Sequence, residues 1–171
     1  MKILSIDHSF KRTGVAVMED YRLIYTGAEE FGEMSYENIE QFYSFVTFLI
    51  KNYKPDVVVT EKPAHMRNIA ILRMLTSLHT MAIIASIKAS IPYSIINPKV
   101  AKKAITGKGN ALKEEVMAKL IKDYGYEEEM LCKKNYYKKD KTKIKNIDYD
   151  ESDAVSNAVA YLIERGIKYE A

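Results

Sequence analysis

The sequence predicts an α/β fold with a five-stranded mixed sheet, in which three antiparallel strands precede two parallel strands and helices flank the sheet. Two observations support this prediction. The first 30 residues contain three short runs rich in β-branched residues, separated by turn-forming residues. Further along the chain, stretches with helical spacing alternate with short, unbroken apolar runs. Such runs are typical of strands covered by helices on both faces.

The predicted strands divide into two groups. Lys2–Ile6, Gly14–Met18 and Arg22–Ala28 are close in sequence, which indicates an antiparallel meander. Val57–Val59 and Pro92–Ile96 are separated by a long helical segment, which indicates a parallel crossover.

Two helices are predicted before the second parallel strand. Ser35–Tyr53 has apolar residues at helical spacing, and a proline follows its end. The segment from about Asn68 to Ser90 is apolar around more than one stripe. Because it contains Arg73, His79 and Lys88, we interpret it as a buried helix rather than a membrane span. It either lies between the sheet and the C-terminal helices or packs one face against a second subunit.

The C-terminal part predicts three more helices, at Lys99–Ile105, Leu112–Tyr124 and Glu151–Arg165. Between the last two, residues 126–147 combine three consecutive glutamates with seven lysines. So high a charge density leaves little apolar surface to bury, and we expect a mobile insertion. No repeat or second domain is visible, so we expect one domain spanning residues 1–171.

Composition bounds the functional class. The chain has 171 residues, of which 47% are hydrophobic, as in ordinary globular proteins. The net charge of +3 is too small to predict nucleic-acid binding by itself. A single cysteine, Cys132, excludes an intrachain disulfide and a cysteine zinc knuckle. We see no targeting segment and expect a cytoplasmic protein.

Four carboxylates stand at the ends of predicted elements: Asp7, Glu61, Asp150 and Asp153. Taken singly, each has an ordinary explanation, such as turn chemistry for Asp7 or favourable helix-start charge for the last two. Clustered acids repel one another, and hard divalent cations are the usual remedy. Together the four therefore predict a metal site of the kind that cleaves phosphodiesters. His8, beside Asp7, either influences the metal site or is an exposed turn residue, and we expect the second.

Two lysine-containing segments are candidates for contact with nucleic acid. Residues 106–113 combine glycines and lysines ahead of a helix, an arrangement that suits phosphate, although a plain solvated turn is the alternative. The lysines of residues 133–145 surround Tyr136 and Tyr137. They form either a solvated loop or a surface that follows a nucleic-acid backbone while the rings stack on bases.

These features together resemble RuvC-type Holliday junction resolvases of the ribonuclease H-like superfamily. The resemblance covers nearly the whole chain and includes Ile6-Asp7 with Thr13-Gly-Val and the strand that ends at Glu61. Residues 97–113 are similar to the family's Pro-x-x-Val-Lys, Gly-x-Gly-x-Ala-x-Lys segment. Asp150-Glu-Ser-Asp-Ala is similar to its terminal Asp-x-x-Asp-Ala motif.

The resemblance implies a ribonuclease H-like fold and a homodimer that nicks two strands of a four-way DNA junction, leaving 5′-phosphates. It implies two Mg²⁺ or Mn²⁺ ions per active site, held by Asp7, Glu61, Asp150 and Asp153. It also implies that Lys102 or Lys103, with Lys113, contacts phosphate. We expect branched DNA as the substrate, no small-molecule cofactor and no membrane. The lysines expected at the DNA, from the resemblance and from the two segments above, are Lys102, Lys103, Lys108, Lys113, Lys133, Lys134, Lys138 and Lys139.

Two other functions fit parts of the sequence. The segment Lys11–Val17 also fits YqgF-type RNA-processing nucleases, although the later motifs do not support that family. A non-catalytic nucleic-acid-binding module of the same fold is the other alternative, and the presence of all four acids argues against it.

Overall fold

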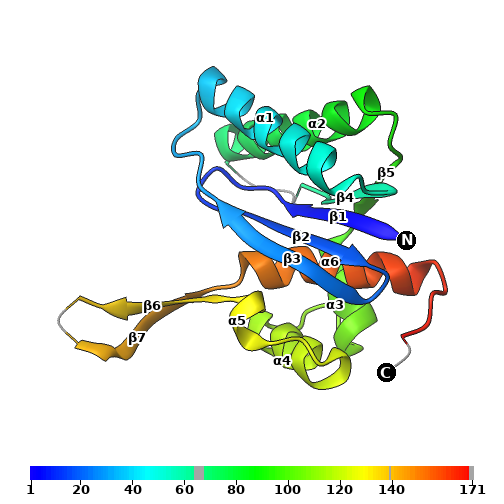
Figure 1. Cartoon of the computed structure of the whole chain (residues 1–171). Helices are drawn as coiled ribbons and strands as arrows, with labels where there is room; N and C mark the ends of the chain where they lie inside the picture. Colours follow the sequence, from blue (N-terminus) through cyan, green and yellow to red (C-terminus); the bar gives the residue numbers. More distant parts are fainter. Residues whose placement is uncertain (64–67, 139, 170–171) are drawn as a thin grey trace.

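The computed structural model describes residues 1–63, 68–138 and 140–169. Its centre is a five-stranded sheet in the order β3-β2-β1-β4-β5 (Figure 1). β1 pairs antiparallel with β2 and parallel with β4. The predicted fold class is therefore confirmed. The strands are β1 (Lys2–Asp7), β2 (Thr13–Glu19), β3 (Arg22–Glu29), β4 (Val57–Glu61) and β5 (Tyr93–Ile96).

Helices cover both faces of this sheet (Figure 1). α1 (Tyr36–Tyr53) and α2 (Ile69–Lys88) lie on one face. The Ser35 hydroxyl caps α1 by accepting a hydrogen bond from the amide of Asn38. α6 (Asp150–Glu164) packs on the opposite face, against β1 and β2. With it lie α3 (Pro98–Thr106), α4 (Lys113–Tyr124) and the short α5 (Glu128–Leu131).

Each face of the sheet has its own hydrophobic core. The core on the α6 side includes Ile3, Val59, Leu120 and Val159. The core on the α1 side is built around Phe42 and Leu78. Burying both faces of β1 and β4 explains why these strands are almost continuously apolar.

The helix α2 differs from its first predicted placement. It packs against α1, β4 and β5, while the C-terminal helices lie on the other face of the sheet. The interpretation that places it between the sheet and those helices is therefore wrong. Only one side of α2 is buried, and Ile69 and Ile87 are 64% and 58% exposed. Within the described residues, α2 is also the one helix long and apolar enough to cross a membrane, by length and composition alone.

The charged segment 126–147 forms α5 and a β-hairpin. The hairpin strands are β6 (Lys133–Tyr137) and β7 (Asp140–Asp148), paired antiparallel. Figure 1 shows this hairpin projecting away from the body of the molecule. β7 is separated from α6 by Tyr149 alone, so the hairpin leads directly into the helix that carries Asp150.

Candidate active site

Sheet register brings the first two predicted acids together. β1 and β4 are parallel neighbours with Ile6 opposite Thr60, so Asp7 and Glu61 leave the sheet at the same edge. α6 begins at this edge with Asp150 and Asp153. The approach is close: a Cβ atom added to Gly14 would lie 2.0 Å from the carbonyl oxygen of Asp150. Only glycine at position 14 leaves room for the start of α6.

The electrostatics of the four acids show that they form one cluster. Burial raises the pKa of Asp7 well above its usual value, and the charges of Glu61, Asp153 and Asp150 raise it further. Burial, followed by the charge of Asp153, raises the pKa of Glu61 to about 7. The pKa of Asp153 is also raised by burial. Such shifts identify a site that lacks enough positive charge for the acids it contains.

Lys113 supplies part of that charge. Its ammonium group, from the first residue of α4, donates a hydrogen bond to Asp153 Oδ2. Burial alone would lower the pKa of Lys113, but the charge and hydrogen bond of Asp153 give a net increase. Lys113 also lowers the pKa values of Asp7 and Glu61. The structure thus places it within the acid cluster.

The remaining predicted lysines have different environments. The Lys102 ammonium donates to the carbonyl oxygen of Ala111 at 2.8 Å, and therefore holds the loop before α4. Lys103 and Lys108 are exposed on and beside α3. On the hairpin, Lys133 and Lys138 are exposed, whereas Lys134 pairs with Glu128 of α5. Lys139 lies outside the described residues.

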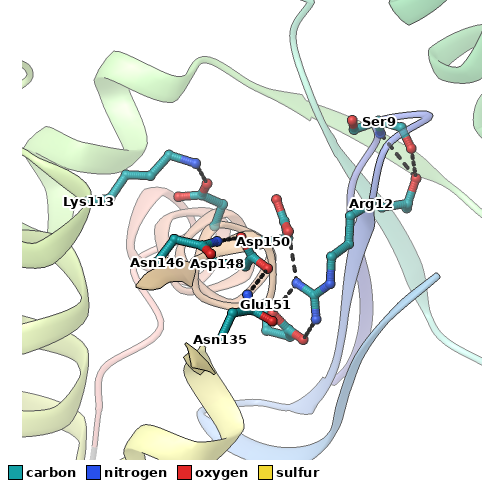
Figure 2. A network of polar contacts seen from close by, with 10 residues as sticks. Ser9, Arg12, Lys113, Asn135, Asn146, Asp148, Asp150 and Glu151 are labelled. Atoms are coloured by element: carbon teal, nitrogen blue, oxygen red, sulfur yellow. Dashed lines mark hydrogen bonds and ion pairs between the residues drawn. The ribbon is translucent and has the colours of Figure 1, made fainter. Parts of the chain in front are cut away.

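Arg12 joins the site although no sequence motif assigned it a role there. Its Nη1 donates to Asp150 Oδ2 at 2.8 Å and to Glu151 Oε2 at 2.9 Å. Its Nη2 donates to Glu151 Oε1, completing a forked contact (Figure 2). Asp150 is the first residue of α6 and directly follows the N-cap residue Tyr149. The one sequence signal was a cation in the turn that follows Asp7.

The expectation for His8 is wrong, because its side chain is buried, with 6% exposed, rather than exposed. Its ring packs against that of His79, with a centroid separation of 5.2 Å. Burial, with the neighbouring His79, lowers the pKa of His8 to about 3. The ring is therefore neutral at physiological pH and contributes no positive charge to the acids.

The donor set fits a hard divalent cation, although the acids are engaged by other partners in this structure. Among the described residues, no three acidic, histidine or cysteine side chains are already arranged to hold a metal ion. Lys113 contacts Asp153, and Arg12 contacts Asp150. Carboxylate oxygens are the ligands that Mg²⁺ and Mn²⁺ prefer. These partly buried acids lack enough positive charge around them, and a bound cation would supply it.

Comparison with known proteins gives a consistent family. The family model described as "Crossover junction endodeoxyribonuclease RuvC" matches residues 3–124. The RuvC of Petrotoga mobilis is 30% identical over 129 residues, covering 70% of this chain and 77% of that protein. The RuvC of Cytophaga hutchinsonii is 32% identical over 90 residues, which span 53% of this chain but 45% of that protein.

The fold agrees with this match. The structure of Thermus thermophilus RuvC has a TM-score of 0.75, with 18% identity over 98% of both chains. The structure of that protein in complex with a Holliday junction substrate has a TM-score of 0.74, with 17% identity over 98% of this chain and 97% of that one. The family match covers more than half of the chain and includes β1, β4 and Lys113. The chain therefore belongs to the RuvC family of crossover junction endodeoxyribonucleases.

Proposed function

We propose that this protein is a metal-dependent endonuclease, one domain over residues 1–171, that resolves four-way DNA junctions by paired nicking. The observation that carries the proposal is the cluster of Asp7, Glu61, Asp150 and Asp153 at one sheet edge, with the pKa values of three of them raised. Acids in such an arrangement cost stability unless they serve a ligand. The relatives named as crossover junction endodeoxyribonucleases support this reaction class.

The four acids would hold Mg²⁺ or Mn²⁺, two ions per site. When bound, such ions would supply activation of an attacking water and stabilisation of the leaving 3′-oxygen, so that the product would carry a 5′-phosphate. Asp7 and Glu61 are fixed by adjacent strands, so they would hold their oxygens in place at the scissile phosphate. Lys113 partly neutralises the acids in the metal-free protein. Once metal and DNA are bound, its ammonium group would turn to a phosphate oxygen.

Exposed lysines outside this cluster would bind the DNA backbone. Lys103 lies on α3 and Lys108 follows that helix, and Lys133 and Lys138 lie on the projecting hairpin. Lysine contacts to phosphate set position without reading sequence. Lys134 and Lys139 complete the proposed set, and Lys134 would have to leave Glu128 to join it. Several simultaneous phosphate contacts make affinity steeply dependent on salt.

A second copy of the chain would cover the exposed side of α2. Ile69, Ile71 and Ile87 on this helix, and Tyr93 and Ile95 on the edge strand β5, are all more than a third exposed. A four-way junction presents paired strands, and a two-fold homodimer would place one active site on each. A cytoplasmic location would fit a protein that acts on branched DNA. It would also fit the free thiol of Cys132, because free thiols persist in a reducing compartment.

The Asp7→Asn variant tests the proposal. Asparagine has nearly the size of aspartate but is a far weaker ligand for Mg²⁺. Cleavage of a synthetic four-way junction should fall by about three orders of magnitude, since the loss resembles that of a transition-state contact. Junction binding without metal should persist or tighten, because one negative charge facing phosphate is removed.

Asp123→Asn provides a matched control, since this residue lies ten positions after Lys113 on α4 and pairs with Lys119. The same assay should include duplex DNA and structured RNA. Preferential cleavage of RNA would favour the RNA-processing alternative, and binding without any cleavage would favour a non-catalytic module. An Asp7→Asn protein that cuts junctions at the wild-type rate would refute the site.

A further inference from the structure

A forked ion pair adjoins the acid cluster on the side of the hairpin. Arg12 reaches from the turn between β1 and β2 to the first turn of α6 (Figure 2). The side chains of Arg12, Glu151 and Asp150 are 13%, 11% and 24% exposed. Glu151 occupies both terminal nitrogens of Arg12, and Asp150 shares one of them through Oδ2. The guanidinium is thus anchored by Glu151 and touches Asp150 from one side.

The charges in this arrangement allow Arg12 to orient Asp150 without neutralising it. Arg12 and Glu151 carry opposite charges, so the pair is neutral as a unit. The pair therefore holds one oxygen of Asp150 in place while adding little net positive charge beside it. The contact involves Oδ2 alone, so the other carboxylate oxygen, Oδ1, is left outside it. A carboxylate held in this way is oriented for a metal ion without losing the charge that attracts the ion.

From this geometry we propose that Arg12 and Glu151 are positioning residues that orient Asp150 for divalent metal. The inference rests on the proposed assignment of Asp150 as a metal ligand. Neither residue is a defined position of the motifs that carry the resemblance. Glu151 occupies the first variable position of Asp-x-x-Asp-Ala, and Arg12 lies between Asp7 and Thr13. Hydrogen-bond partners that orient a ligand contribute about 10- to 100-fold to metal affinity in other sites.

Arginine is needed because its planar fork holds two carboxylate oxygens at once. A lysine at this position would keep the charge but could not bind Glu151 with two nitrogens and Asp150 as well. Glutamate is needed because, without it, the full charge of Arg12 would act on Asp150 and compete with the metal. The two residues should therefore act as a unit, and removing either should impair metal binding.

The test compares Arg12→Gln, Glu151→Gln, the double variant and Arg12→Lys. Calorimetry with Mn²⁺, without DNA, gives metal affinity directly. Cleavage of a four-way junction against Mg²⁺ concentration gives the half-saturating concentration, and junction binding without metal gives DNA affinity. Thermal melting checks that each variant is folded. Arg12 and Glu151 border a pocket of about 510 Å³ at the base of the hairpin, so the substituted side chains have room to repack.

Each single variant should weaken Mn²⁺ binding and raise the half-saturating Mg²⁺ concentration by about 10-fold. The double variant should bind Mn²⁺ little more weakly than either single variant, because each single substitution already breaks the Arg12–Glu151 pair. Arg12→Lys should fall between wild type and Arg12→Gln. If Glu151→Gln fails to fold, the double variant, in which neither member of the Arg12–Glu151 pair is left without the other, and Arg12→Lys still decide the question.

The two charge changes distinguish positioning from a direct DNA contact. If Arg12 served only the DNA, Arg12→Gln would weaken metal-free junction binding, Glu151→Gln would strengthen it, and neither would change Mn²⁺ affinity. That result, or additive effects in the double variant, would overturn the inference while wild-type cleavage kept the proposed function intact. A wild-type protein that neither binds Mn²⁺ nor cuts junctions would instead refute the proposed function.

Discussion

Replacing Glu61 with glutamine should stabilise the metal-free protein at alkaline pH while abolishing cleavage. Burial and the charge of Asp153 raise the pKa of Glu61 from 4.5 to about 7 in the folded state. The folded protein therefore binds this proton more tightly than the unfolded chain does. The favourable contribution is complete below pH 4.5 and is lost as the pH rises through 7. Glutamine cannot ionise, so the variant should not share this loss.

The magnitude follows from the size of the shift. At about 1.4 kcal/mol per pH unit, the rise from 4.5 to about 7 corresponds to roughly 3 kcal/mol. This value is an upper bound, because Glu61 is only half-buried and solvent screens its charge. We expect Glu61→Gln to gain about 1–3 kcal/mol relative to wild type at pH 8, and little at pH 4.

Urea denaturation at pH 4 and pH 8, with and without Mg²⁺, measures this difference. Added Mg²⁺ should stabilise wild type more than the variant, because only wild type keeps the complete ligand set. Glu33→Gln, at an exposed position of the loop before α1, is the control and should show no such pH dependence. A Glu61→Gln protein whose stability relative to wild type is the same at both pH values would refute the electrostatic argument.

Three further predictions concern other parts of the molecule. Gly14→Ala should destabilise the fold by roughly 2 kcal/mol or more, measured by urea denaturation, because its Cβ would clash with the Asp150 backbone. Changing Lys133 and Lys138 to glutamine should reduce the salt slope of junction binding by about 0.9 for each phosphate that is no longer neutralised, and an unchanged slope in a titration would contradict this. Ile87→Asp should shift a dimer towards monomer in analytical ultracentrifugation, whereas an unaltered mass would exclude α2 from the interface.

The succession of strands along the chain and the position of each acid at the end of an element could be predicted from the sequence. Hydrophobic periodicity and turn residues are local signals, and a mixed sheet of this order has few topologies. The resemblance to ribonuclease H-like nucleases implied that Asp7 and Glu61 meet, and the parallel pairing of β1 with β4 in the structure brings them to one edge of the sheet. The start of α1 was equally local, since Ser35 caps its own helix.

Which charges face one another depends on the tertiary structure. Arg12 meets Asp150 and Glu151 across 138 and 139 positions of sequence, and neither periodicity nor motif spacing encodes such a contact. The burial of His8 and the exposed side of α2 likewise depend on which elements pack over them. The β6–β7 hairpin was not predicted, because its lysine-rich strands lack the apolar pattern that marks a strand in the sequence. Backbone hydrogen bonds pair these two strands in the structure. Local patterns specify elements, but the environment of a charge is set by its neighbours in space, and these come from distant parts of the chain.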